Sequence, residues 1–150
     1  MKKSIIMTGA ASLLLLISSC CGCRGGKSVS HTLTSDSWKL VELGGGEKLA
    51  ASNDDSYTIT FVDGDESRVF GCGDCNRYFG SYKEEATHRL TFSHMGSTRM
   101  MCPNQEGEDK FFTALDKVDS YTIDGDNLML QNNGDVVAIF EAIPLINVEK

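Results

Sequence analysis

The sequence predicts a mainly β (α+β) domain, a small antiparallel β-barrel or roll of seven or eight strands with one packed α-helix. Short runs in which apolar and polar residues alternate recur along the chain, as they do in half-buried strands. Asp-Gly and Asn-Gly pairs separate several of these runs and are strong hairpin signals. Only one segment has the apolar spacing of an amphipathic helix, so strands and helices do not alternate. Without crossover helices, we expect the sheet to close on itself.

The N-terminus has the pattern of a signal peptide, residues 1–19. Lys2-Lys3 precede an apolar run, Ile5–Ile17, that is too short to span a membrane. The sequence Ile17-Ser18-Ser19-Cys20 resembles the lipobox of bacterial lipoproteins, which implies cleavage before Cys20 and lipidation of that residue. Cys21 is a weaker candidate, and an ordinary secretory signal is the alternative. Several acyl chains would anchor the domain without a membrane-spanning helix.

Residues 20–35 are rich in glycine, serine and threonine and lack an apolar period, which predicts a flexible tether. His31 is expected to be solvated in this tether. Cys21 and Cys23 could pair with each other, be acylated or stay free. The tether starts with Cys-Cys-Gly-Cys-Arg-Gly-Gly-Lys and carries no acidic residue there, which favours a periplasm-facing position in the cell envelope.

The chain has 14 basic and 21 acidic residues, a formal net charge of −7. Removal of the signal peptide takes two lysines with it and makes the mature chain more acidic. Because an acidic surface repels phosphate backbones and anionic lipid, we expect no nucleic-acid binding, and membrane contact through the lipid anchor alone. Export also places the cysteines where disulfides can form.

The first half of the domain is predicted to contain three strands. Trp38–Leu43 forms the first and ends in a run of three glycines, and Tyr57–Phe61 alternates cleanly. Asp63-Gly64-Asp65 is a turn signal, and a third strand starts with Arg68-Val69-Phe70.

A hairpin and the helix follow. Tyr78–Tyr82 and Arg89–Phe92 are predicted to pair, with Lys83–His88 as a polar connection. The helix begins after Pro103, with Asn104 as its N-cap and acidic residues in its first turns, where the helix dipole favours negative charge. Its apolar face consists of Phe111, Phe112, Leu115 and Val118.

The chain ends in a predicted meander with strands at 120–123, 127–131 and 135–141, separated by Asp-Gly-Asp and Asn-Asn-Gly turns. Pro144 ends the last strand. The folded domain is therefore expected to span residues 36–144, with 145–150 as a frayed C-terminal tail.

The stretch from Gly71 to Pro103 carries a recognisable pattern. It contains G-x-x-x-C-N-x-x-x-G-x-Y, then L-x-F-x-x-M-x-S-T-R-M-x-C-P, and the helix adds E-x-x-F-x-x-A-L. Together with a W-x-L strand at the start and an L-x-L hairpin near the end, the pattern resembles the META domain, a family that includes HslJ-type heat-inducible bacterial lipoproteins. The resemblance covers about residues 36–141. The matching residues are Gly71, Cys75, Asn76, Phe79, Gly80, Tyr82, Leu90, Phe92, Met95, Ser97, Thr98, Arg99, Met100, Cys102, Pro103, Glu108, Phe111, Ala114 and Leu115, with Trp38, Leu40, Leu128 and Leu130 in the flanking strands.

The resemblance implies a compact β-rich fold with one helix, no established enzymatic activity, and an association with envelope stress, antibiotic tolerance or virulence. It also implies a structural disulfide between Cys75 and Cys102. Cys72 departs from the family pattern and leaves alternatives open. It could pair with either of those cysteines, act as a redox thiol, or contribute to a metal site completed by His88 or His94.

Asn76 and Arg99 are further candidates, each as a ligand contact or as a structural anchor. Asn76 suits local hydrogen bonding to backbone. Arg99, if partly buried, would need acceptors such as backbone carbonyls or Asp74. Gly80 indicates a bulge or a close backbone approach. Gly107 is unexpected in the first turn of a helix, where a better helix former would cost about 1 kcal/mol less.

No catalytic residue is assigned, because the three histidines and the scattered carboxylates compose no complete catalytic set. We therefore expect a non-enzymatic, lipid-anchored envelope protein that binds an unidentified partner protein and uses no cofactor or metal. One alternative is a thiol- or metal-dependent protein centred on Cys72, Cys75 and Cys102. Another is a small inhibitor of a secreted hydrolase, with Lys83–His88 as its blocking loop.

Overall fold

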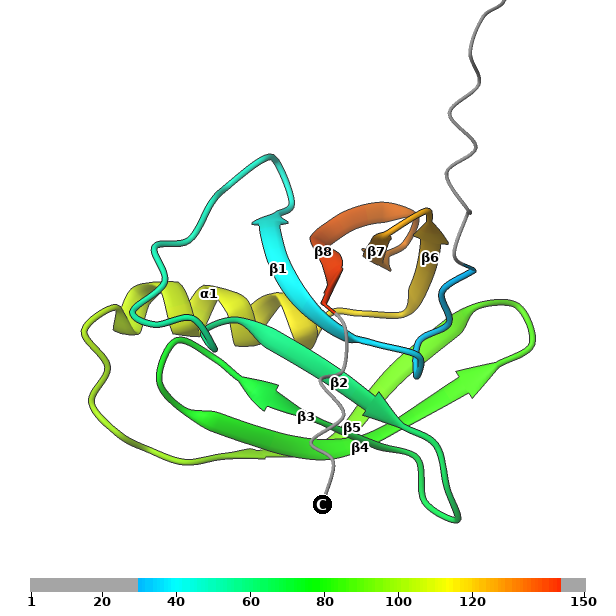
Figure 1. The fold of residues 1–150 in the computed structure, drawn as a ribbon, viewed down its shortest axis with the longest axis horizontal. Helices are drawn as coiled ribbons and strands as arrows, with labels where there is room; N and C mark the ends of the chain where they lie inside the picture. The colour runs from blue at the N-terminus through cyan, green and yellow to red at the C-terminus, as the bar shows by residue number, and fades with distance from the viewer. Residues whose placement is uncertain (1–29, 144–150) are drawn as a thin grey trace, which may run out of the picture.

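A computed structural model describes residues 30–143 and places eight antiparallel strands and one helix in a single closed barrel (Figure 1). The predicted fold class is confirmed. The elements are β1 (Ser37–Leu43), β2 (Thr58–Val62), β3 (Arg68–Cys72), β4 (Arg77–Glu85), β5 (Arg89–Ser97), α1 (Gln105–Leu115), β6 (Ser120–Asp124), β7 (Asn127–Asn132) and β8 (Asp135–Ile143).

Each strand pairs with its neighbours in the chain, and β1 closes the barrel by pairing with β8. The pairing between β5 and β6 is the shortest in the barrel, and Arg89 lies opposite Ser120 in it. The helix lies between these two strands in sequence and turns its apolar face to the barrel interior. Phe111 on that face packs against Tyr57, Tyr78 and Phe140. The helix therefore completes the core against residues of β4 and β8.

Two irregular strand pairs explain features of the sequence. The register shifts between Leu40 and Glu42, which accounts for the imperfect alternation of the first strand and buries Leu43. In the β4–β5 pair a second shift lies beside Gly80. A Cβ at Gly80 would lie 2.5 Å from the Met95 sulfur and 3.0 Å from the Ser93 carbonyl oxygen, so the predicted bulge or close backbone approach at this glycine is confirmed.

The β4–β5 hairpin is longer than predicted. Lys83, Glu84 and Glu85 belong to β4, and only residues 86–88 connect it to β5. The predicted polar connection of Lys83–His88 is therefore wrong in its first half. Polar residues at an exposed strand end carry no signal that separates them from a loop.

The folded part begins before residue 36. Leu33 is 3% exposed, and its carbonyl accepts a hydrogen bond from the Trp38 indole at 3.0 Å. His31 is not solvated, contrary to expectation, because its ring contacts Asp36 at 2.6 Å and Asp126 at 3.0 Å. Two carboxylates, one nearby in the chain and one 95 residues away, thus fix the end of the predicted tether.

Residues 30–143 include no helix long and apolar enough to cross a membrane. The predicted signal peptide, Cys20, the other two tether cysteines and the tail at 145–150 lie outside the described residues.

Candidate functional site

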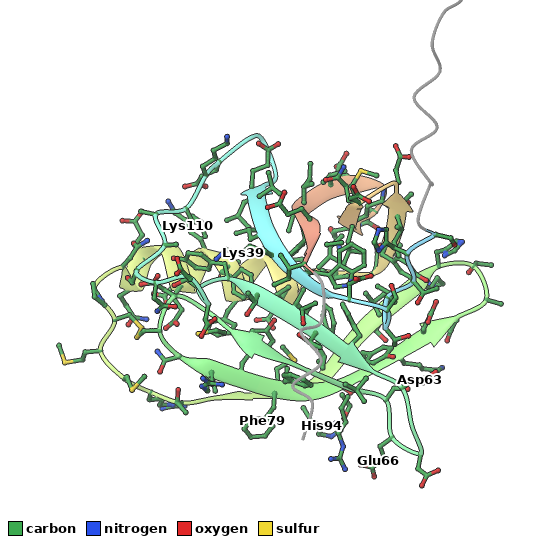
Figure 2. The ribbon with its side chains drawn as sticks, viewed as in Figure 1. Lys39, Asp63, Glu66, Phe79, His94 and Lys110 are labelled. Atoms are coloured by element: carbon green, nitrogen blue, oxygen red, sulfur yellow. A yellow bond between two sulfur atoms is a disulfide. The ribbon has the colours of Figure 1, made fainter. Side chains whose placement is uncertain are left out.

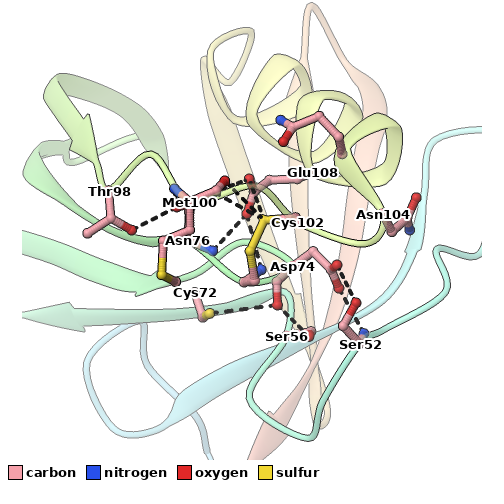
Figure 3. The surroundings of a disulfide bond; sticks show 12 residues. Ser52, Ser56, Cys72, Asp74, Asn76, Thr98, Met100, Cys102, Asn104 and Glu108 are labelled. Atoms are coloured by element: carbon pink, nitrogen blue, oxygen red, sulfur yellow. Dashed lines mark hydrogen bonds between the residues drawn. A yellow bond between two sulfur atoms is a disulfide. The ribbon is translucent and has the colours of Figure 1, made fainter.

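Asn76 is the centre of a hydrogen-bond network at the end of β3 and the start of β4 (Figure 3). Its Oδ1 accepts from the Met100 N–H at 2.7 Å and from the Thr98 hydroxyl at 2.9 Å, and its Nδ2 donates to the Met100 carbonyl at 3.1 Å. Asn76 therefore satisfies both backbone groups of Met100, as a neighbouring strand would. The structure assigns it the role of structural anchor.

Glu108 meets Asn76 from the first turns of the helix. One carboxylate oxygen accepts from the backbone N–H groups of Cys75 and Asn76 at 3.2 and 2.9 Å, and the other accepts from Asn76 Nδ2 at 2.6 Å. The side chain is 2% exposed, and these donors replace its hydration shell. Glu108 thereby fastens the helix to the strand–turn segment.

Asp74 organises the opposite side of the same turn. Its carboxylate accepts from the N–H of Ser52 at 2.8 Å and from the hydroxyl of that residue, and its carbonyl accepts from the Ser56 hydroxyl at 2.7 Å. Burial alone would raise the pKa of Asp74, but the hydrogen bonds from Ser52 outweigh it and hold the pKa below its usual value. Asp74 does not pair with Arg99, contrary to one of our expectations.

A disulfide joins Cys75 to Cys102 across a separation of 27 residues, with Cα atoms 5.6 Å apart. This is the pairing that the family resemblance implied. It attaches the loop that follows β5 to the Asn76 turn. Together with the Asn76 hydrogen bonds, it holds residues 98–102 in one conformation.

Two glycines make room for this network. A Cβ at Gly73 would lie 2.6 Å from a Glu108 carboxylate oxygen. A Cβ at Gly107 would lie 2.3 Å from the Asn104 side-chain nitrogen and 2.6 Å from the Tyr57 hydroxyl. The lack of space at Gly107 explains why a poor helix former occupies the first turn of the helix.

The loop also carries exposed side chains beside a cavity of about 290 Å³, which is lined by Asn76, Ser97, Thr98, Arg99, Met100, Gln105, Glu108, Asp109 and Phe112. Arg99 is exposed and forms no hydrogen bond or ion pair with any described residue. Met101, the next residue but one, is 98% exposed. The structure therefore brings Asn76 and Arg99 to one cavity, but it uses the first as an anchor and leaves the second free.

The alternative sites do not assemble. Cys72 is a free thiol on β3, and burial raises its pKa, which disfavours the reactive thiolate. Among the described residues, the one group with metal-ligand geometry is Cys75, Cys102 and Glu108, and its two sulfurs form the disulfide. His88 instead packs against Tyr121, and His94 lies on the outer face of the barrel beside Phe79.

Sequence reasoning missed the two carboxylates that hold the site together. Glu108 entered only as a residue that matches the family pattern, and Asp74 entered only as a possible partner of Arg99. The available signal was the spacing of Glu108 in the family pattern. It lies three residues before Phe111 and seven before Leu115, and so on the apolar face of the helix.

A family model described as META domain matches residues 31–143. Among solved structures, a protein from Burkholderia xenovorans determined by NMR is 25% identical, with a TM-score of 0.57 over 74% of this chain and 83% of that chain. A second NMR structure is 23% identical, with a TM-score of 0.56 over 77% of this chain and 95% of that chain. A crystal structure of a DUF4847 family protein from Bacteroides vulgatus is 20% identical, with a TM-score of 0.53 over 73% of this chain and 93% of that chain. The last two likenesses show the fold alone. No curated protein matches the chain.

Proposed function

The chain belongs to the META domain family, and from this premise we propose that it is a non-enzymatic, lipid-anchored protein of the bacterial cell envelope that binds a partner protein through the loop Ser97–Pro103. The META domain family is not a known enzyme family. The proposed role is in envelope stress or antibiotic tolerance, with the domain facing the periplasm.

One observation carries the binding role. Asn76 binds both backbone groups of Met100, whereas the side chains of Arg99, Met100 and Met101 are exposed and Arg99 has no partner among the described residues. A loop held rigidly by its scaffold loses little conformational entropy when it binds. Methionine side chains adapt to apolar surfaces, and a guanidinium pairs with carboxylates. This combination suits a protein segment with an apolar residue beside an acidic one.

The absence of an enzymatic role is supported by how the buried polar groups are used. Asp74, Asn76 and Glu108 each bond to backbone or hydroxyl groups of the fold itself. No buried side-chain nitrogen or oxygen among residues 30–143 lacks a partner. A set of groups that satisfy one another has little capacity left for a reacting substrate.

The partner is tested by crosslinking intact envelopes and capturing the protein. Exchange of both Arg99 and Met101 for alanine is expected to abolish capture of a specific envelope protein without changing stability. Lys48→Ala, at an exposed position outside the loop, is the matched control. Unchanged capture in the double variant would contradict the proposal that the partner binds through this loop.

The anchor is tested by metabolic labelling with an alkyne-bearing palmitate in a bacterial host. Cys20→Ala is expected to abolish the label and release the protein from the membrane, whereas Cys21→Ala is the matched control and keeps both. A label that is lost only in the Cys21 variant would contradict the assignment of Cys20.

A further inference from the structure

A cavity of about 530 Å³ opens at the end of the barrel opposite the Asn76 network. Its walls come from the segment before β1, the connection after β2, the far end of the β4–β5 hairpin, and β6 with the turn that follows it. Figure 1 shows the first of these segments between β6 and the hairpin. Asn76 precedes β4 and Glu84 lies near its far end, so extended strand separates them by about 26 Å. The cavity is therefore separate from the proposed binding loop.

The segment before β1 is a fixed wall of this cavity. Leu33 is buried, and its carbonyl accepts a hydrogen bond from the Trp38 indole at 3.0 Å. His31 is held between Asp36 and Asp126, at 2.6 and 3.0 Å, so any positive charge on its ring is offset. The volume lies within the range of about 300–1,000 Å³ that is usual for small-molecule sites, which often occupy the mouths of β-barrels.

Two carboxylates in the walls are each held by one oxygen. The Tyr121 hydroxyl donates to Glu84 Oε1, and the Ser67 hydroxyl donates to Asp63 Oδ1 at 3.3 Å. Figure 2 shows Asp63 at the end of β2. Among residues 30–143, the second oxygen of each carboxylate has no hydrogen-bond or ion-pair partner. Both groups are therefore oriented by the fold and keep one oxygen that can accept from a ligand.

The electrostatics of the cavity favour a cation. Burial raises the pKa of the Tyr82 hydroxyl, and the charges of Asp63 and Glu84 raise it further, so both carboxylates act on the same end of the barrel. In the described part of the chain, no lysine or arginine lines the cavity. A hollow lined by charge of one sign concentrates ions of the opposite sign.

The shape of the site favours an organic cation over a metal ion. Among residues 30–143, the cavity has no three carboxylate or imidazole groups within 4.8 Å of one another, so a single ion would find few protein ligands. Leu33 and Ile123 supply apolar surface instead. The ring of Tyr121 packs edge to face with that of His88, at 5.2 Å between centroids, and an aromatic ring attracts an ammonium group. Amines joined by methylene groups match these walls.

We propose that this cavity binds an aliphatic polyamine. Glu84 and Asp63 each accept hydrogen bonds from an ammonium group, and Leu33 and Ile123 contact the methylene groups between the amines. This site is independent of the loop Ser97–Pro103, so the two ends of the barrel serve different ligands.

The test is calorimetric titration of the full chain with spermidine at fixed pH and ionic strength. Glu84→Gln and Asp63→Asn are each expected to weaken binding about tenfold, because each removes a charge-assisted hydrogen bond. Glu85→Gln and Asp65→Asn are the matched controls. They remove the same charge from exposed neighbours that do not line the cavity, and should change the affinity less than about twofold, since solvent and salt screen them.

Failure of spermidine to bind would overturn the proposal, and so would equal weakening in the cavity variants and their controls, because surface charge alone would then explain the binding. Urea unfolding checks that Glu84→Gln, which removes the acceptor of Tyr121, remains folded. Asp63→Asn lies in an exposed connection and tests the site independently of that hydrogen bond.

Two further probes test the class of ligand. An uncharged octanediol has a similar methylene chain without ammonium groups, and magnesium chloride supplies a divalent cation without methylenes. Neither is expected to bind or to displace spermidine at equal concentration. Binding of the diol as tightly as spermidine, or displacement of spermidine by Mg²⁺ at equal concentration, would overturn the assignment to a polyamine.

Discussion

Glu108 accepts hydrogen bonds from both the backbone and the side chain of Asn76, at 2.9 and 2.6 Å. The helix and the β3–β4 turn, which are 32 residues apart in sequence, are thus joined through one buried carboxylate. The same Asn76 holds Met100 in place, so the link continues into the exposed loop. The scaffold and the proposed binding loop are therefore one connected unit.

Replacement of Glu108 by glutamine is expected to lower the free energy of unfolding by about 2–3 kcal/mol, because an amide NH2 would face N–H donors and the charged acceptor is lost. Urea unfolding measures the change. The control is Glu106→Gln, at an exposed position whose ion pair with Lys110 is screened by solvent and should contribute little to stability. Equal losses in the two variants would mean that the buried carboxylate has no special role.

Removal of the Cys75–Cys102 disulfide by alanine substitution of both residues is expected to cost about 3–4 kcal/mol, since the bond closes a loop of 27 residues. Thermal and urea unfolding under non-reducing conditions report the loss. Cys72→Ala should keep the disulfide and most of the stability. Loss of the disulfide in the Cys72 variant would contradict the pairing.

Gly80→Ala is expected to destabilise the domain by about 1–3 kcal/mol, because the new methyl group would collide with Met95 and with the Ser93 carbonyl. Gly64→Ala is the control, since its Cβ would meet nothing closer than 3.9 Å. Comparison of the two urea midpoints decides the point. A Gly80 variant as stable as the control would show that the bulge adapts.

Stability is expected to fall as pH rises through the folded-state pKa of His31. The hydrogen bond to Asp36 raises that pKa, burial opposes the shift, and the bond to Asp126 adds to it. A raised pKa means that the contribution is complete below the unfolded-state pKa of about 6.5 and is lost as the pH rises from there through the folded-state pKa. Unfolding measured from about pH 5.5 to 8.5 should show this decline in the natural protein. A decline of the same size in His31→Gln would assign it to other groups.

The barrel could be predicted because its signals are local. Alternation in Tyr57–Phe61 and the Asp-Gly and Asn-Gly turns of the C-terminal meander act over a few residues, and the helix has its own N-cap in Asn104. Hairpin-linked strands then have few ways to arrange themselves. The end of β4 was harder to predict, because Lys83 and Glu85 are equally suited to an exposed strand and to a loop.

The candidate site could be predicted only in part. The family pattern identified Asn76 and the two paired cysteines. It could not show that Glu108 is buried, because a carboxylate in the first turns of a helix is ordinarily solvated and its partners lie 32 residues away. The contacts of His31 with Asp36 and Asp126 were missed for the same reason, since the second partner is 95 residues distant.

The most direct test of the proposed binding role is photo-crosslinking in living cells with a photoreactive amino acid at position 101, compared with the same residue at position 48. We expect that position 101 forms a crosslink to one envelope protein, that position 48 does not, and that Arg99→Ala removes the crosslink. Identical crosslink patterns at the two positions, or a crosslink that is indifferent to Arg99, would contradict the proposal that this loop binds a partner.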